Sequence, residues 1–183
     1  MVAKYGKALL PPSKSVDAAI YCVGHCPPGG SLEAVSQPLS RYSPIKLQQE
    51  IGWHILGPFN VFQEFLPIVR DGGHFVFMSS AITRILQMPP ITRPPIHPYH
   101  HIAVIVAEDA LIEGMRMDPE VAKRGIKIHK IMPPAISDSP FHKTESDIGP
   151  RPPITVTTGE VVKAITKSLL ALSHEDVLML PQK

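Results

Sequence analysis

The sequence predicts an α/β protein with a partial Rossmann-like, three-layer fold, in which helices flank a mostly parallel β-sheet. Two observations carry this prediction. Short apolar runs alternate with amphipathic segments of helix length, and a parallel crossover needs a connection of that length. The 21 prolines cluster mainly between these segments. At 183 residues the chain can bury a substantial core, so we expect a single domain over residues 1–183.

The first elements are a strand, a long helix and a second strand. The run VDAAIYCVGH at residues 16–25 is apolar and is followed by the turn sequence PPGG, as a buried strand would be. A helix is predicted from Ile51 to Val69, because apolar residues recur there at steps of three and four. Pro58 should kink this helix and Asp71-Gly72-Gly73 should end it. The second strand follows at residues 74–80.

The alternation then continues to the end of the chain. A helix is predicted at residues 101–117 and a third strand at 125–134. The helix should bury a face made of Ile102, Val106, Ala110 and Met117. A last helix begins at Thr157, which matches a capping box with Glu160, and DVLML near the end favours a last strand. Proline-rich loops are expected at 86–98 and 137–156.

The composition argues against several classes of partner. With 18 basic and 16 acidic residues the net charge is +2, too small to attract nucleic acid or an anionic membrane. No apolar stretch reaches the roughly 18 residues that a membrane helix needs. Two cysteines are too few for a disulfide scaffold, and the N-terminus lacks the apolar core of a signal peptide. We therefore expect a cytoplasmic protein that acts on a small molecule.

The order of elements resembles the second part of a short-chain dehydrogenase/reductase. The similarity runs from VDAAIYCVGH through GWHILGPFNVFQEFLPIVRDGGHFVFMSS and AEDALIEG to KRGIKIHKIMPPAI and GEVVKAI. In that family these segments resemble the Asn-Ala-Gly strand, the long helix and serine strand, the Tyr-Lys helix, the strand before Pro-Gly and a late helix. The resemblance implies oxidoreductase-like chemistry on small molecules, including the biosynthesis of specialised metabolites.

One departure from the family pattern concerns the cofactor. The family uses NADP or NAD and holds its pyrophosphate on a Gly-rich turn at a helix N-terminus. Only 15 residues precede Val16, whereas a βαβ unit takes roughly 30. We therefore treat the N-terminal βαβαβ half as missing and expect no cofactor.

A second departure concerns the catalytic residues. The resemblance places Cys22 on the Asn of Asn-Ala-Gly, His54 on the helix Asn, Val104 on the Tyr and Glu108 on the Lys, whereas Ser80 matches the family serine. A phenol relays protons poorly at neutral pH without a nearby cation, and loss of general acid catalysis typically costs about 10²–10⁴-fold in rate. Ordinary NAD(P)-dependent reduction should therefore be deficient, and whether the chain is an enzyme stays open.

Ser80 and Tyr99 are the candidate catalytic residues. Ser80 should lie at a strand end, where its hydroxyl can donate to a substrate oxygen. Tyr99 lies in HPYHH, residues 97–101, where a protonated histidine would ease loss of its proton. We favour the alternative that HPYHH is a surface loop whose histidines contact nothing. No metal site is expected, because Cys22 and Cys26 lack a second pair of ligands.

Three functional hypotheses follow. The chain is an enzyme that acts on a carbonyl, alcohol or enol substrate, including by isomerisation or cyclisation; or it is a non-catalytic partner of a full-length paralogue; or it is a truncated gene product. In relatives the long helix lies in a subunit interface, so the resemblance implies a homo- or hetero-oligomer through the helix Ile51 to Val69. The alternative is that this helix packs only on its own sheet.

Overall fold

The computed structural model describes residues 15–23, 38–87, 99–138 and 155–179. Its main sheet has four parallel strands in the order β1-β2-β3-β6, with the bounds Val16–Tyr21, Val69–Met78, Lys127–Met132 and Glu175–Leu178. Two short strands, β4 (Ala135–Ile136) and β5 (Thr155–Val156), form a separate parallel pair. The predicted α/β class and parallel sheet are confirmed.

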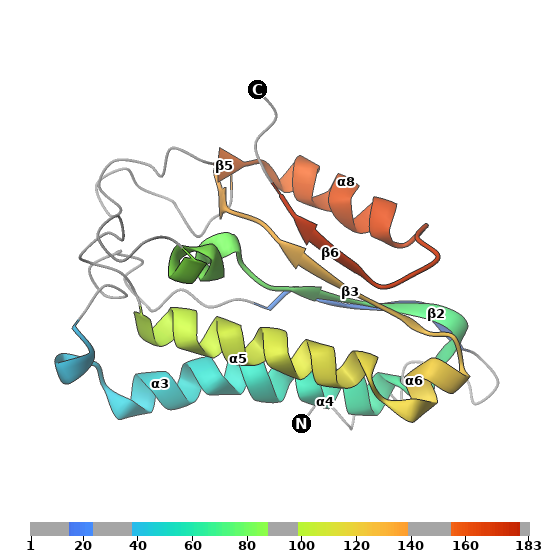
Figure 1. The fold of residues 1–183 in the computed structure, drawn as a ribbon, viewed down its shortest axis with the longest axis horizontal. Helices are drawn as coiled ribbons and strands as arrows, with labels where there is room; N and C mark the ends of the chain where they lie inside the picture. Colours follow the sequence, from blue (N-terminus) through green and yellow to red (C-terminus); the bar gives the residue numbers. More distant parts are fainter. Residues whose placement is uncertain (1–14, 24–37, 88–98, 139–154, 180–183) are drawn as a thin grey trace.

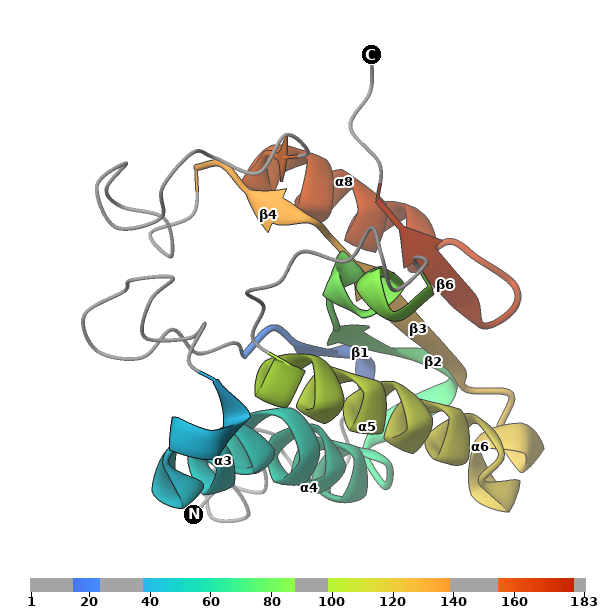
Figure 2. The ribbon, with the colours of Figure 1, turned by 60° about the vertical axis from the view of Figure 1, so that its left-hand side comes forward.

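Helices lie on both faces of the main sheet, which gives the predicted three layers (Figure 1). On one face α3 (Pro44–Ile51), a π-helical turn η2 (Gly52–Leu56) and α4 (Gly57–Phe65) form one long helix, and α5 (Tyr99–Arg116) runs beside it (Figure 2). The other face carries α8 (Thr158–Ser168). Shorter helices are η1 (Leu39–Arg41), η3 (Ala81–Gln87) and α6 (Pro119–Lys123). Among the described residues, no helix combines the length and apolarity needed to cross a membrane.

The core fills the space on both sides of β2. Phe75 and Phe77 are fully buried in a cluster with residues of α4 and α5, such as Phe62 and Ile112. Val76 points to the other face and packs in a second cluster, with Ile131 and Val161. Successive side chains of a strand point to opposite faces, so a strand covered on both sides is continuously apolar. Burial on both faces of the sheet explains why the run before the two serines is continuously apolar.

The long helix ends earlier than predicted, because Val69 belongs to β2 rather than to the helix. The last helical residue is Phe65, and Pro67 follows it. Leu66 keeps helical backbone angles as the C-cap, and Pro67 has no N–H with which to continue the helical hydrogen bonds, which accounts for the early end. Asp71-Gly72-Gly73 do not stop the helix. They form an irregularity inside β2, where the pairing with β1 jumps from Val69 to His74 and Gly72 has a φ of 67°.

Next to Pro58, where a kink is predicted, the long helix contains the π-helical turn η2. The Gly57 N–H donates to the Gly52 carbonyl, and Pro58 has no N–H to donate to the Trp53 carbonyl. The Tyr21 hydroxyl from β1 donates to that carbonyl instead, at 2.6 Å. Burial, with a smaller effect of Glu108, raises the pKa of Tyr21 to about 12. The proline therefore creates an acceptor that joins the long helix to the sheet.

The buried faces of both long helices differ from the predicted apolar faces. The long helix buries Glu50, His54, Pro58 and Phe62, at steps of four residues, whereas Ile51 is exposed. On α5 the predicted face is wrong at Val106, Ala110 and Met117, which are exposed. Apolar periodicity fails here because charged residues occupy the middle of the interface between the two helices.

The C-terminal predictions are confirmed. Thr157 and Glu160 form the capping box of α8, and Val161 is buried on its inner face. The predicted last strand corresponds to β6. The proline-rich loop predicted at 86–98 lies outside the described residues from residue 88 on. The loop predicted at 137–156 is described only at its ends, where β5 is a strand.

Replacing Gly57 by alanine should destabilise the protein. A Cβ atom at Gly57 would overlap the Tyr21 hydroxyl, whereas one at Gly52 would meet nothing within 4 Å. We expect Gly57→Ala to cost about 1–3 kcal/mol of unfolding free energy, as overpacked substitutions do. The matched control Gly52→Ala should add up to about 1 kcal/mol, because alanine favours a helix. Urea denaturation measures both, and equal effects of the two variants would contradict the Tyr21 contact.

A buried histidine pair links β2 and β3 on the face that carries α8. His74 Nδ1 lies 2.9 Å from His129 Nε2, and the rings stack with centroids 5.2 Å apart. One ring must donate and the other accept, so at least the accepting ring is neutral. Burial, followed by nearby cationic groups, lowers the pKa of His129 to about 4 and also lowers that of His74.

This pair should make the protein less stable in mild acid. An unfolded histidine takes up a proton near pH 6.5 but the folded pair does not, so its stabilisation is complete above pH 6.5 and is lost as the pH falls towards about 4. The loss from His129 amounts to at most about 3 kcal/mol. His129→Gln should flatten the unfolding free energy between these pH values. Identical pH profiles for the variant and the wild type would show that the pair does not titrate in this way.

Candidate functional site

Two serines follow β2 at the carboxyl edge of the sheet, which is where parallel sheets bind ligands. The hydrogen-bond ladder continues beyond the strand: the Ser79 N–H donates to the Ile131 carbonyl at 2.8 Å, and the Ala81 N–H donates to the Pro133 carbonyl at 3.0 Å. Ser80 is thereby held between the ends of β2 and β3. Its predicted place at a strand end is confirmed.

The hydroxyl groups of the two serines are used differently. Ser79 is buried, and its Oγ donates to Asp109 Oδ1 at 2.7 Å. Ser80 is half-buried, and its Oγ accepts from the Ile82 N–H at 3.2 Å, at the start of η3. A hydroxyl that accepts in this way keeps its own proton. Ser80 can therefore still donate to a substrate oxygen, whereas the Ser79 hydroxyl already donates its hydrogen bond to Asp109.

His54 and Glu108 contact each other across the two long helices. His54 Nδ1 lies 3.1 Å from Glu108 Oε2, and Glu108 is completely buried. By the family resemblance these positions correspond to the helix Asn and the Lys of the Tyr-Lys pair. The tertiary structure thus brings into contact two positions at which this chain departs from the family pattern. Where the family pattern has a lysine, this chain has a carboxyl group paired with a histidine. His54 is itself buried, so it is an interior histidine with a partner.

The environment of Glu108 favours its protonated form. Burial raises the pKa of Glu108 above its ordinary value, and the hydrogen bond with His54 opposes this only in part. Its second oxygen, Oε1, is buried and has no hydrogen-bond partner among the described residues. A carboxyl group of this kind, bonded to an imidazole, can hold a proton at the Oε2 to Nδ1 contact and exchange it with the ring.

Glu50 is the centre of a second group of polar side chains. Glu50 Oε1 lies 3.4 Å from His100 Nε2, and Oε2 lies 3.6 Å from His101 Nδ1. The Tyr42 hydroxyl donates to Glu50, and its ring stacks on His100 with centroids 3.6 Å apart. Burial alone would raise the pKa of Glu50, but its close contacts with His100 and His101 and the hydrogen bond from Tyr42 hold it below the ordinary value. Glu50 is therefore an ionised carboxylate under the surface.

The two groups form one continuous cluster. The rings of His54 and His101 meet edge to face with centroids 5.3 Å apart, which joins the Glu108 side to the Glu50 side. We call the whole set the helix-interface cluster: Tyr42, Glu50, His54, His100, His101 and Glu108. The expectation of a surface loop is wrong for His100 and His101, because both lie in the first turn of α5 and contact Glu50. His97 lies outside the described residues.

The remaining predicted residues lie apart from this cluster or at its end. Tyr99 is the first residue of α5 and is half-buried; its catalytic role stays a prediction. Val104 is buried in α5, and Cys22 is exposed after β1. Sequence reasoning missed Glu50 and Tyr42. The signal available was that Glu50 lies four residues before His54 and so shares its helix face.

No group of three or more metal-ligating side chains occurs among the described residues. Cys26 lies outside them.

Comparisons with known proteins identify the fold. No family model matches the sequence, and no curated protein is similar to it at a significant level. Solved structures do match. They include an alcohol dehydrogenase from the archaeon Thermococcus sibiricus complexed with 5-hydroxy-NADP (16% identity, TM-score 0.71, covering 100% of this chain and 72% of that one). A short-chain dehydrogenase from Burkholderia cenocepacia in complex with NADP is 19% identical (TM-score 0.70, covering 97% and 64%).

A third match is a 4-hydroxyisoleucine dehydrogenase complexed with NADH and succinate (16% identity, TM-score 0.67, covering 97% and 73%). These likenesses show that the chain has the α/β fold of short-chain dehydrogenases/reductases. They also correct the expectation that no cofactor is involved, because proteins of this fold were crystallised with NADP or NADH.

The described residues fit such a cofactor only at the carboxyl edge of the sheet. Cys22, Ser80 and Pro133 follow the ends of β1, β2 and β3, where ligands of open α/β sheets bind. The part of the chain that the structure describes has no Gly-rich turn from a strand into a helix, which is the element that holds a pyrophosphate. It does not fit the phosphate end of a dinucleotide.

Replacing Glu108 by glutamine should stabilise the protein increasingly as the pH rises. The raised pKa of Glu108 means that its contribution to stability is fully present below pH 4.5 and is lost as the pH rises through its folded pKa. Glutamine keeps the shape and can still bond His54, but it never ionises. The measurement is the difference in unfolding free energy between Glu108→Gln and wild type from pH 4 to 8. A constant difference over that range would show that Glu108 ionises as easily in the folded protein as in the unfolded one.

Proposed function

We propose that this chain acts on the carbonyl, alcohol or enol group of a small molecule, with Ser80 as the residue that hydrogen-bonds the reacting oxygen. The observation that carries the proposal is the state of the Ser80 hydroxyl. It lies at the carboxyl edge of the sheet, it accepts rather than donates its local hydrogen bond, and its proton is available. The matched structures of this fold are described as dehydrogenases, which supports the substrate class.

Proton transfer at this site would differ from that of the family. A donor aimed at a carbonyl oxygen stabilises the negative charge that develops there when an enolate forms. In the family a lysine favours ionisation of the tyrosine, whereas this chain places Val104 and Glu108 at those positions. The carboxyl of Glu108 and the ring of His54 lie within hydrogen-bonding distance of each other, at 3.1 Å. We propose that this exchange of residues makes ordinary NAD(P)-dependent reduction slow and favours enolisation, in which a water molecule takes the α-proton while Ser80 stabilises the oxygen of the enolate. Tyr99, at the start of α5, is proposed as a second residue at the substrate.

A second candidate function, docking on another subunit, is favoured by one observation. The solvent side of the long helix exposes Ile51, Leu56 and Phe59. Isolated exposed apolar residues are ordinary, but several on one helix suit an interface with a homologous chain. The prediction of an oligomer through this helix is retained for α3 to α4, without Val69, which lies in β2.

Removing the Ser80 hydroxyl should reduce proton transfer strongly. Exchange of the α-hydrogens of small ketones and β-keto esters for deuterium, followed by NMR, reports enolisation without any hydride step. We expect Ser80→Ala to lower the catalysed exchange by about 10²-fold, as loss of one oxyanion donor does. NADPH and NADH oxidation with the same ketones should stay slow in both proteins.

Ser79→Ala is the matched control. It removes a hydroxyl from the neighbouring residue and leaves Asp109 without that bond, so it should lower the melting temperature but keep the exchange rate within a few-fold. Full activity of Ser80→Ala, or equal losses in both variants, would remove the assignment of Ser80.

A further inference from the structure

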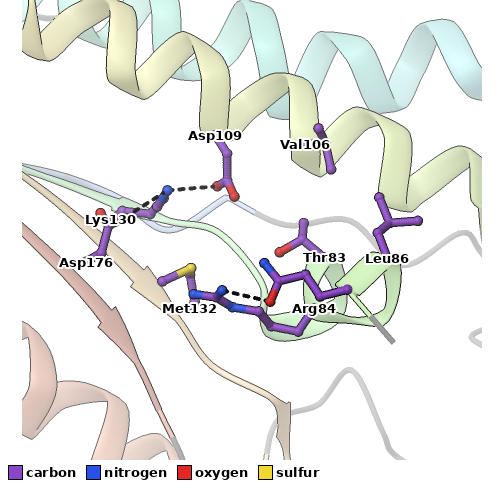
Figure 3. A pocket seen from close by; sticks show the side chains of 9 residues that line it. Thr83, Arg84, Leu86, Val106, Asp109, Lys130, Met132 and Asp176 are labelled. Carbon is purple, nitrogen blue, oxygen red and sulfur yellow. Dashed lines mark hydrogen bonds and ion pairs between the residues drawn. The ribbon is translucent and has the colours of Figure 1, made fainter. Parts of the chain in front are cut away.

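A pocket of about 360 Å³ opens between α5, η3 and the ends of β3 and β6 (Figure 3). Its volume is at the small end of the range for ligand sites. Its walls are formed by Thr83, Arg84, Leu86, Gln87, Val106, Asp109, Lys130, Met132 and Asp176. None of Ser80, His54 and Glu108 lines it; Thr83 in its wall donates to the Ser80 carbonyl, so the pocket adjoins the candidate site and has its own lining residues. It also uses the face of α5 that is turned away from the helix-interface cluster.

The acidic wall of the pocket is held rigidly by buried cations. Lys130 is buried, and its Nζ lies 3.2 Å from Asp176, 3.6 Å from Glu113 and 3.7 Å from Asp109. Arg116 binds Asp176 at 2.8 Å and Glu113 at 2.9 Å from the other side. Although burial opposes it, the Arg116 guanidinium lowers the pKa of Asp176. Of the residues that line this wall, Lys130 faces the two carboxylates Asp109 and Asp176, which leaves the wall one negative charge in excess.

Asp109 is the group on this wall that can bind a ligand. Both its hydrogen bond from Ser79, at 2.7 Å, and its contact with Lys130 involve the same oxygen, Oδ1. The other oxygen makes no hydrogen bond or ion pair with the described residues. Figure 3 shows the carboxyl group directed into the pocket from α5. A carboxylate oxygen that is held in place and left without a donor is suited to an ammonium group.

The opposite wall is positive. Arg84 belongs to η3, and its Nη1 donates to Gln87 Oε1 at 3.1 Å, which orients the guanidinium. The other N–H groups of Arg84 form no hydrogen bond to the part of the chain that is described, and a guanidinium binds a carboxylate in a two-point geometry. Val106, Leu86 and Met132 also line the pocket and offer an apolar surface.

We infer that this pocket binds a small zwitterion with an aliphatic group, such as an amino acid, whose ammonium pairs with Asp109 and whose carboxylate pairs with Arg84. A zwitterion matches both walls, because its ammonium can pair with the wall that has an excess of negative charge and its carboxylate can pair with the cation of the opposite wall. A ligand with a single charge would satisfy one wall and leave the other unpaired. The apolar lining residues fit an aliphatic side chain.

Calorimetric titration of the full chain with L-leucine tests this inference. Two probes of nearly the same shape each lack one charge: 4-methylpentanoate has no ammonium, and isopentylamine has no carboxylate. We expect saturable binding of leucine and affinities about tenfold weaker for each of the other two, the loss of one charge-assisted hydrogen bond. Absence of saturable leucine binding, or equal affinity for a singly charged probe, would overturn the inference.

Variants of Asp109 and Arg84 test which charged group of leucine each wall binds. Asp109→Asn can still accept the Ser79 bond, and it should bind leucine and 4-methylpentanoate equally, because the ammonium no longer contributes. Arg84→Gln should bind leucine and isopentylamine equally for the corresponding reason. Arg70→Gln removes an exposed arginine that pairs with Asp17 elsewhere, and it should leave leucine affinity unchanged.

Two further comparisons separate leucine binding in this pocket from the role of Ser80 and from a general charge effect. Ser80→Ala should bind leucine like the wild type, which separates this pocket from the proposed function. Equal losses in Arg84→Gln and Arg70→Gln, in proteins with unchanged melting temperatures, would show a general charge effect and overturn the site.

Discussion

The burial of ionisable groups between α5 and the long helix is the constraint on which the arrangement depends. Glu108 has no exposed surface, and a buried carboxyl group without a partner costs several kcal/mol. Its hydrogen bond to His54 can form only at one position of the two helices along each other. The contact between Glu50 and His100 imposes the same requirement, because Glu50 lies one helical turn before His54 on the long helix. The paired groups act as a register device, in which polar contacts select one packing among several that apolar side chains alone would tolerate.

Once α5 is held in this register, its opposite face organises the carboxyl edge of the sheet. Asp109 meets Ser79 at the end of β2 and Lys130 in β3. Arg116, two turns on, donates to the carbonyls of Ile128 and Glu175 and so ties α5 to β3 and β6. One helix therefore connects the helix-interface cluster, the serine pair and the pocket, and each face of it carries a different set of charged groups.

The fold alone does not decide the chemistry. The matched dehydrogenase structures share the sheet and helix arrangement at 16–19% identity. In this chain the positions that resemble the family's Asn and Lys hold a histidine and a carboxylic acid, which pair with each other. Burial raises the pKa of the Glu108 carboxyl and so favours its neutral form, whereas a lysine supplies a fixed positive charge. The fold is retained, and a carboxyl group whose neutral form is favoured stands at the position of the family's positive charge.

The sequence by itself determined the α/β class, the parallel sheet, the capping box at Thr157 and the place of Ser80 at a strand end. These features depend on local periodicity and on short-range hydrogen bonds. It did not determine that Val69 begins a strand, or that Glu50 and Glu108 are buried, because a charged residue in a helix pattern is ordinarily assigned to the solvent face. Only the tertiary structure decided that, since their partners, His100 and His54, are about 50 residues away in the chain.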